Sequence, residues 1–395
     1  MKNTSSVLLF AIYLTIVSCS NSSDYTDNSV ADLYPTVTSK FAGKIDLNNL
    51  DNYANQTIPA YITKDNTAGN PITNKGATLG RVLFYDTNLS SNNTISCSSC
   101  HIQANAFGDI AIASDGVNGA TTRHSMRLAN SRFSIENKFF WDERAATLEF
   151  QTTQPIQNHT EMGFSGTGGD GSISTLIAKL QNIAYYKELF KYTYGSDKIT
   201  ENKIQLALAQ FIRSIQSFDS KYDAGRALVA NENQNFSNFT AQENLGKNLF
   251  LTAPIFDATS SRISGGVGCA ACHAAPEFDI DPNTKNNGII GVLNSIGIDI
   301  TNTRAPSLRN LAKTDGTLNG PMMHTGNLTS LKNVIGHYGT INLAPKNTNL
   351  DPRLAPNGFG QQLNLTPTEV DALVAFLKTL SGTNVYIDSK WSSPF

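Results

Sequence analysis

Two short cysteine motifs carry the clearest chemical information in this sequence. The pattern C-x-x-C-H is found at Cys97, Cys100 and His101, and again at Cys269, Cys272 and His273. In such a pattern the two thiols bond to the vinyl groups of a porphyrin, and the histidine becomes the proximal ligand of its iron. The sequence therefore predicts two covalently bound haem c groups, with His101 and His273 as iron ligands. A single zinc site built from the four cysteines would leave both histidines without a role.

Length and charge narrow the class of protein further. The chain has 395 residues, a length that suits two domains of about 150–190 residues each. Its formal net charge is −2 and it has no cluster of basic residues, which excludes nucleic acid as a partner. The hydrophobic fraction of 40% is ordinary for a folded globular protein and allows a sizeable core.

The amino terminus has the features of an export signal. Lys2 supplies the positive start, and an apolar run from Val7 to Val17 follows that is too short to span a bilayer comfortably. Residues 1–18 are therefore predicted to be a signal peptide. Export agrees with the cysteine motifs, because bacteria attach haem c outside the cytoplasmic membrane.

The end of this signal has a particular form. Ile16 to Cys19 resembles the bacterial lipobox, in which the cysteine is lipid-modified and anchors the protein to the membrane. The alternative is an ordinary signal peptide with a chance cysteine. Residues 19–45 are then a lipid-anchored tether, and the polar stretch from Ser20 to Lys40 is expected to have little fixed structure. We expect an exported lipoprotein that faces the periplasm or the cell surface of a Gram-negative bacterium.

A repeated helical pattern must position the two cysteine motifs. Leu79 to Phe84 and Leu245 to Phe250 both read L-G-(Lys/Arg)-x-L-F, and each precedes one motif. This internal duplication predicts two similar units, each with a helix, a loop that carries the motif and further helices around a haem. Apolar spacing predicts other helices over residues 174–194, 200–218 and 366–380, and Gly/Ser runs predict loops over 163–172 and 264–268.

We therefore predict a mainly α fold of two c-type cytochrome-like domains, each enclosing one covalent haem. The predicted boundaries are residues 46–235 for the amino-terminal domain and 236–395 for the carboxy-terminal domain. No alternating strand pattern is long enough to support a sheet domain.

Four further stretches resemble one protein family. They are Leu79 to Ser90, Phe140 to Glu149, Gln151 with Glu161 to Gly163, and Ala305 to Asn310 leading to His324 to Gly326. Together they resemble the bacterial di-haem cytochrome c peroxidase family, whose relatives include the di-haem enzymes that mature tryptophan tryptophylquinone. The resemblance covers roughly Pro71 to Gly382.

The resemblance implies an enzyme that reduces hydrogen peroxide to water. Its amino-terminal haem would be peroxidatic, and its carboxy-terminal haem would relay electrons from a small cytochrome c or a cupredoxin. A homodimer is common among such proteins. Two alternatives stay open: a di-haem oxidase of a protein or organic substrate, and a non-enzymatic di-haem electron carrier.

The same resemblance assigns roles to individual side chains. Glu161 would be the acid/base group that moves a proton between the peroxide oxygens, and Gln151 would orient peroxide or water. Trp141 resembles the tryptophan that lies between the haems. Arg123 and Arg144 could pair with haem propionates. His159 is a second candidate for the peroxide pocket, or an exposed loop histidine.

The sequence also departs from the family pattern. Residues 116–119 lack the loop histidine that caps the peroxidatic iron in many members, and His124 stands where an asparagine helps to hold an interdomain calcium ion. These departures leave the Ca2+ site and the activation switch open. For the sixth ligand of the carboxy-terminal iron the resemblance favours Tyr338, and the alternatives are Met322, Met323 and His337.

Overall fold

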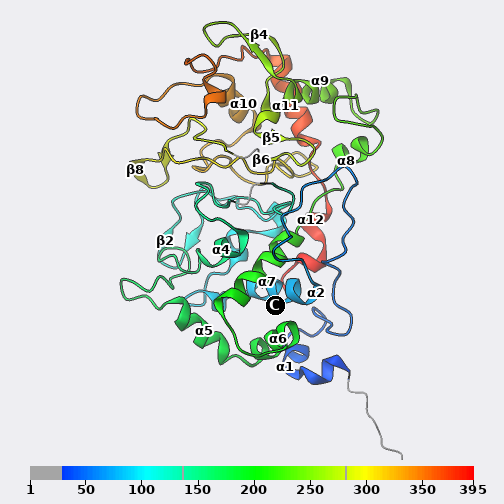
Figure 1. Ribbon diagram of the computed structural model, residues 1–395, viewed down its shortest axis with the longest axis vertical. Coiled ribbons are helices and arrows are strands. Elements are labelled where there is room, and N and C mark those ends of the chain that lie inside the picture. Colours follow the sequence, from blue (N-terminus) through cyan, green and yellow to red (C-terminus); the bar gives the residue numbers. More distant parts are fainter. Residues whose placement is uncertain (1–28, 136–137, 281–282) are drawn as a thin grey trace, which may run out of the picture.

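The computed structural model describes residues 29–135, 138–280 and 283–395. The predicted signal peptide, residues 1–18, and the predicted anchor Cys19 lie outside the described residues. Figure 1 shows an elongated molecule whose two halves are stacked along its long axis. Within the described ranges, no helix combines the length and the apolar character needed to cross a bilayer.

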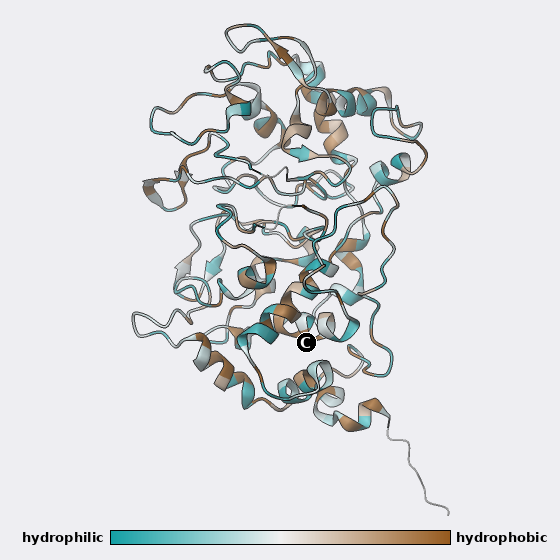
Figure 2. Ribbon diagram, viewed as in Figure 1, coloured by the Kyte–Doolittle hydropathy of each residue, from teal (hydrophilic) through white to brown (hydrophobic). Residues whose placement is uncertain are grey.

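Helices dominate the secondary structure. The helices, with 3-10 helices labelled η, are η1 (Val30–Leu33), α1 (Pro35–Lys40), α2 (Asn74–Tyr85), η2 (Thr87–Leu89), α3 (Cys97–Cys100), η3 (Gln103–Asn105), α4 (Leu148–Thr153), α5 (Ile173–Gln181), α6 (Ala184–Tyr194), α7 (Glu201–Ser214), α8 (Lys221–Arg226), α9 (Ala241–Leu251), η4 (Cys269–Ala271), α10 (Leu331–Gly339), η5 (Pro352–Leu354), α11 (Pro367–Lys378), α12 (Asn384–Ile387) and η6 (Ser389–Trp391). Figure 2 shows apolar and polar residues alternating along their ribbons, as expected for helices that turn one face to a core.

The strands are short and pair two by two. The antiparallel pairs are β1 (Asp115–Gly116) with β2 (Gly119–Ala120), β3 (Pro254–Phe256) with β4 (Arg262–Gly265), β5 (His273–Ala274) with β6 (Asp279–Ile280), and β7 (Gly291–Val292) with β8 (Ser295–Ile298). The prediction of a mainly helical fold with little sheet is confirmed.

Two hydrophobic cores divide the molecule. The first collects buried side chains between Val37 and Ile215, together with Val385 and Trp391 near the carboxy terminus. The second collects buried side chains between Tyr222 and Leu380. We call the parts around these cores the amino-terminal unit and the carboxy-terminal unit; the domain boundary at residue 235 stays a prediction. Figure 1 shows α12 returning to the amino-terminal unit after α11.

The main helices of both units begin in the same way. In each, a threonine side chain accepts a hydrogen bond from an amide of the first turn, which would otherwise lack a partner. These caps are Thr73 for α2, Thr200 for α7, Thr240 for α9 and Thr366 for α11.

Each unit is built on a close crossing of two helices at a glycine. In the amino-terminal unit, a Cβ on Gly80 of α2 would lie 2.0 Å from the Ala207 carbonyl oxygen of α7. In the carboxy-terminal unit, a Cβ on Gly246 of α9 would lie 1.9 Å from the Ala372 carbonyl oxygen of α11. Only glycine allows such an approach of two helix backbones. The glycines of the repeated L-G-x-x-L-F pattern therefore occupy equivalent places.

A second pair of residues supports the internal duplication. The Asn130 side chain donates to the Ser217 carbonyl, just beyond α7, at 3.1 Å. The Asn310 side chain donates to the Gly382 carbonyl, just beyond α11, at 3.4 Å. Both asparagines have positive φ, 63° and 55°, so the two units share this turn as well as the helix crossing.

The segment before the first unit is more ordered than its composition predicts. The expectation of little fixed structure up to Lys40 is wrong for α1, because Val37 and Phe41 are 0% and 1% exposed in the first core. The amides of Thr36 and Val37 also donate to the Glu188 carboxylate of α6. Apolar spacing of four residues in an otherwise polar stretch is enough to dock this helix.

Two local predictions need correction. The helix predicted over residues 174–194 is interrupted, because Ile183 has extended backbone angles between α5 and α6. In the run predicted as a loop over 264–268, Ser264 and Gly265 belong to β4. The helices predicted near residues 200 and 366 are α7 and α11.

Candidate functional site

The first cysteine motif lies on α3 and faces the core of the amino-terminal unit. The His101 amide donates to the Cys97 carbonyl at 2.9 Å, which turns the histidine back over the helix. The ring Nδ1 of His101 lies 3.2 Å from the Phe107 carbonyl oxygen. A hydrogen bond donated by Nδ1 leaves Nε2 with the lone pair that an iron ligand needs. This geometry fits a haem c group held by Cys97, Cys100 and His101.

The protonation states at this motif agree with that use. Burial raises the pKa of the Cys97 thiol to about 12 and that of the Cys100 thiol to about 11. Burial also lowers the pKa of His101, so its imidazole is neutral and can ligate a metal. Neither cysteine forms a disulfide, so both are available for porphyrin attachment.

The second motif opens into a large cavity in the carboxy-terminal unit. The cavity has a volume of about 400 Å3, and Cys269, Cys272 and His273 contribute to its lining. Much of the remaining lining is apolar and comes from helices α9, α10 and α11. Burial lowers the pKa of His273 to about 4, so its ring is neutral. Volume, lining and donor set fit a second haem c group.

Three of the four candidates for the sixth iron ligand line this cavity. They are Tyr338, Met322 and Met323. His337 instead directs Nε2 to the Asn287 carbonyl oxygen at 2.9 Å. Burial raises the pKa of the Tyr338 hydroxyl, and negative charge on Cys272 contributes to that shift. The tyrosine hydroxyl and the second cysteine pair therefore share one pocket.

Glu161 lies beside the first motif. The Asn158 side chain accepts hydrogen bonds from the amides of Thr160 and Glu161, and the Glu161 carbonyl accepts from the Val117 amide at 3.0 Å. The β1–β2 hairpin and this turn thus fix the glutamate backbone. Burial raises the pKa of its carboxyl group, and Arg144 opposes that shift. The Glu161 charge in turn raises the pKa values of Cys97 and Cys100.

The other two residues predicted near Glu161 are Gln151 and His159. Gln151 is on α4, which leads into the turn at Asn158, but in the described part of the chain no hydrogen bond joins the Gln151 and Glu161 side chains. His159 is 58% exposed and binds Asp170 through Nδ1 at 2.8 Å. It is therefore an exposed loop histidine, which was the alternative interpretation.

Trp141 lies at the boundary of the two units. Its indole Nε1 donates to the His124 carbonyl in the amino-terminal unit at 2.7 Å. Its own carbonyl accepts from the Arg304 amide in the carboxy-terminal unit at 2.7 Å, and its ring centroid is 6.3 Å from that of His324. The tryptophan also lines the cavity at the second cysteine motif, which we call the second cavity.

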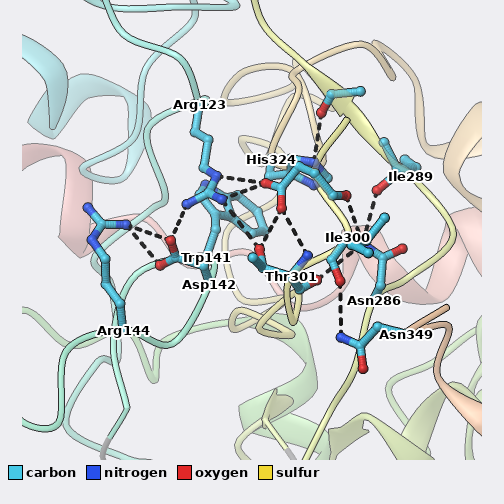
Figure 3. Close-up of polar contacts among 12 residues, drawn as sticks. Arg123, Trp141, Asp142, Arg144, Asn286, Ile289, Ile300, Thr301, His324 and Asn349 are labelled. Carbon is cyan, nitrogen blue, oxygen red and sulfur yellow. Dashed lines mark hydrogen bonds and ion pairs between the residues drawn. The ribbon is translucent and has the colours of Figure 1, made fainter. Parts of the chain in front are cut away.

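Figure 3 shows an ion-pair network around this tryptophan. Arg123 binds Asp142 of its own unit and Asp299 of the other unit, both at 2.5 Å. Arg144 binds Asp142 at 2.8 Å. Both arginines that the sequence assigned to haem propionates are thus engaged with carboxylates at the interface.

His124 also belongs to the interface. Its Nδ1 lies 3.0 Å from the Ala111 carbonyl oxygen, and its amide donates to the His324 carbonyl at 2.7 Å. Burial lowers its pKa, and the residue contributes to the lining of the second cavity. Among the described residues, no group of three or more His, Cys, Asp or Glu side chains is arranged to hold a metal ion.

Two arginines that the sequence left without a role face the second cavity, Arg127 and Arg304. Nε and Nη2 of Arg304 are buried and make no hydrogen bond within the described residues, and Nη2 is 3.6 Å from Asp279. Arg127 donates to the Ser307 carbonyl, and its Nε is buried without a partner there. Buried guanidinium donors of this kind fit the propionates of a haem. In the sequence, Arg304 could have been found only from its position, because it directly precedes the A-P-S-L-R-N stretch.

Comparisons with known proteins agree with this arrangement. A family profile described as "Di-haem cytochrome c peroxidase" matches residues 74–230. The chain is 29% identical to "Methylamine utilization protein MauG" of Methylophilus methylotrophus over 323 residues, 79% of this chain and 84% of that protein. It is 28% identical to "Cytochrome c551 peroxidase" of Nitrosomonas europaea over 325 residues, 78% of this chain and 80% of that protein.

A solved structure has the same fold. It is the crystal structure of "a MauG-like protein associated with microbial copper homeostasis", with a TM-score of 0.67 and 28% identity. The match covers 86% of this chain and 99% of that one. The paired helix crossings and both cysteine motifs therefore lie within a known architecture.

Proposed function

Since the chain belongs to the di-haem cytochrome c peroxidase family, we propose that it reduces hydrogen peroxide to water with two electrons from a small redox protein. The family has two c-type haems, and the two C-x-x-C-H motifs provide both attachment sites. The observation that supports peroxide chemistry most directly is the desolvated Glu161 carboxyl beside Cys97 and Cys100. A simple electron carrier has no use for such a group.

Proton transfer is the part of the reaction that this chain performs itself. When bound, the amino-terminal haem supplies an iron that binds peroxide and delivers electrons to it. Glu161 takes the proton from one peroxide oxygen and returns it to the other, which leaves as water. In total, one hydrogen peroxide takes up two protons and two electrons and gives two water molecules, of which this water is the first. The burial that raises the pKa of Glu161 makes it a better proton acceptor and donor near neutral pH. Gln151 would orient the peroxide.

We propose that the electrons cross the interface of the two units. A cytochrome c or cupredoxin would donate to the carboxy-terminal haem, and Trp141 would couple that haem to the amino-terminal one. The indole is bonded to the amino-terminal unit through His124 and lines the second cavity. A large aromatic residue that is hydrogen-bonded to both units, through its indole and through its backbone carbonyl, suits such a relay.

A second candidate function rests on Tyr338. In this family the sixth ligand is a methionine in the peroxidases and a tyrosine in the quinone-maturing relatives. An anionic oxygen ligand stabilises oxidised iron and lowers its potential relative to methionine. With Tyr338 in the second cavity, the oxidising equivalents of peroxide would be stored and used on a protein or organic substrate.

One experiment distinguishes these functions. The holoprotein is mixed with peroxide and either reduced cytochrome c or a reduced cupredoxin, and the oxidation of the donor is followed optically. Two donor molecules oxidised per peroxide, at a rate that saturates with donor, support the peroxidase. Peroxide consumption without donor oxidation supports the oxidase, and no peroxide consumption contradicts both.

The cellular setting is part of the proposal. We propose an exported lipoprotein anchored through Cys19, whose mature tether leads to α1. Cys19→Ser should release the protein from membranes into the soluble fraction, and unchanged membrane association would refute the anchor. An interdomain Ca2+ ion and a homodimer remain proposals that metal analysis and light scattering of the purified protein would test.

A further inference from the structure

The amino-terminal unit contains two adjacent tyrosines that share one carboxylate. Tyr185 and Tyr186 of α6 both donate to Oδ2 of Asp86, each at 2.7 Å. Their ring centroids are 4.7 Å apart. The other oxygen of Asp86 accepts from the amide and the side chain of Asn88 at 2.8 Å and 2.9 Å. Asp86 is only 3% exposed, so this is a satisfied, buried carboxylate.

The pair connects the first cysteine motif to the surface. Tyr186 is fully buried in the first core, and Cys97 of the first motif packs against that same core. Tyr185 is partly exposed. Its ring lies 5.4 Å from that of Phe41, and the Lys40 amine is 6.0 Å from its centroid. One tyrosine is therefore buried in the core that the first cysteine motif contacts, and the other is partly exposed at the edge of the same unit.

We propose that Tyr186 and Tyr185 form a redox relay that carries oxidising equivalents from the amino-terminal haem site to the protein surface, with Asp86 as proton acceptor. The relay rests on the proposed peroxidase function, because peroxide supplies the oxidant. A phenol loses an electron much more easily when a hydrogen-bonded base takes its proton at the same time, and a buried carboxylate is such a base.

The steps balance in atoms and electrons. Tyr186 loses one electron towards the peroxide-oxidised haem site and its phenolic proton to Asp86, which leaves a neutral tyrosyl radical and a protonated carboxyl group. Tyr185 then gives one electron to Tyr186 and its proton to Asp86, while Asp86 returns the first proton to Tyr186. A one-electron reductant at the surface finally restores Tyr185, which takes its proton back from Asp86.

Another tyrosine provides an internal comparison. Tyr85, at the end of α2, donates its hydroxyl to the Trp391 backbone carbonyl at 2.6 Å. A carbonyl oxygen is a poor proton acceptor, so Tyr85 has a similar aromatic environment without the base. Tyr85→Phe is therefore the matched control for Tyr186→Phe.

The test uses the holoprotein mixed with peroxide in the absence of reductant, frozen within milliseconds and examined by EPR spectroscopy. The wild type and Tyr85→Phe should show a tyrosyl radical signal, which Tyr186→Phe should lose. Asp86→Asn should lose it as well. Because Asp86 also caps η2, its replacement can impair folding, and Tyr185→Phe therefore serves as a second variant. In Tyr185→Phe the radical should stay on Tyr186. It should also decay more slowly than in the wild type when a reductant is added at the surface.

The outcomes separate the relay from the peroxidase. Two outcomes overturn the relay and leave the peroxidase intact, provided that peroxide is consumed. In one, the radical signal is unchanged in Tyr186→Phe, and in the other, the wild type shows no tyrosyl radical. If peroxide is not consumed, a photogenerated ruthenium(III) complex in solution replaces it as oxidant. Mass spectrometry should then locate oxidation at Tyr185, and the extent of this oxidation should be smaller in Asp86→Asn. Oxidation spread evenly over the exposed tyrosines contradicts the relay.

Discussion

Arg123 and Asp299 join the two units through one carboxylate oxygen, which lies 2.5 Å from Nη2 and 3.1 Å from Nε of the arginine. Nη1 of the same arginine binds Asp142, the residue after Trp141. The guanidinium therefore holds the boundary tryptophan and the carboxy-terminal unit together. Burial alone would raise the pKa of Asp299, but hydrogen bonds from Thr301 and Arg123 lower it below its ordinary value.

Removing this ion pair should destabilise the protein. Arg123→Ala leaves the partly buried Asp299 without its cation and Asp142 with Arg144 alone, and we expect a loss of about 2 kcal/mol in the free energy of unfolding, between the values for exposed and buried pairs. Arg144→Ala is the control, since Arg144 is more exposed and binds only Asp142 among these residues, and should cost less than about 1 kcal/mol. Because the pKa of Asp299 is lowered, the wild type should have a larger free energy of unfolding than Arg123→Ala at neutral pH. This difference should vanish as the pH falls through the pKa of Asp299. Equal denaturation curves for both variants at neutral pH would contradict the clamp.

Glu161→Gln should abolish peroxide turnover and leave both haems attached. The amide cannot accept the peroxide proton, and a loss of about 100-fold or more is typical for a missing acid/base group. In the wild type, activity should fall in acid with a midpoint above the usual glutamate value, because burial raises this pKa. His159→Gln, which alters an exposed side chain, should keep full activity.

Although Glu161→Gln should lose activity, it should be more stable than the wild type at neutral pH. A carboxyl group whose folded pKa is raised favours folding only while it is protonated, so its contribution is lost as the pH rises through that pKa. The variant should therefore melt at a higher temperature than wild type at neutral pH, and the difference should shrink in acid.

The amino-terminal iron should be open in the isolated protein. Residues 116–119 contain no histidine, Nδ1 of His124 lies against the Ala111 carbonyl, and His124 lines the second cavity. We expect an EPR signal of high-spin ferric haem as isolated and reaction with peroxide without prior reduction. A protein that is low-spin at both haems and inert until half-reduced would contradict this prediction and point to His124 as the cap.

Tyr338 should be the sixth ligand of the carboxy-terminal iron. Tyr338→Phe should change the optical spectrum of the ferric protein and raise the potential of that haem, because an anionic ligand is lost. Leucine variants of Met322 and Met323 should leave the spectrum unchanged. A near-infrared methionine-to-iron band in the wild type that survives in Tyr338→Phe and disappears in a methionine variant would show that the ligand is a methionine.

The helix crossings should not tolerate a side chain. Gly80→Ala and Gly246→Ala place a Cβ about 2 Å from a helix carbonyl, and such overpacking costs about 3 kcal/mol or more. Gly336→Ala is the control, because this glycine of α10 has open space around its Cβ position, and alanine there should stabilise by about 0.5–1 kcal/mol. Chemical denaturation measures all three, and a neutral Gly246→Ala would argue against the close crossing.

The sequence predicted those features that depend on local spacing. The two cysteine motifs, the helical class and the repeated L-G-x-x-L-F helices follow from residue types at short separations, and the paired crossings at Gly80 and Gly246 agree with the duplication. The polar composition of residues 20–40 gave a wrong prediction at α1. Two apolar residues are enough there to dock the helix on a core formed by distant helices.

Long-range pairing could not be predicted in this way. Arg123 and Arg144 have carboxylate partners that only the meeting of two units supplies. Arg304 and Arg127 face the second cavity because the A-P-S-L-R-N stretch folds back against Trp141. The shared carboxylate of Tyr185 and Tyr186 likewise depends on α6 packing beside the end of α2.

The return of the chain end to the amino-terminal unit has a consequence for biogenesis. Trp391 is buried in the first core, and the carbonyls of Trp391 and Ser392 bind Tyr85 and Arg81 of α2. The first core is therefore complete only when Val385 and the residues after it are in place. The second core needs residues up to Leu380, so both haem units gain their last core side chains late in synthesis.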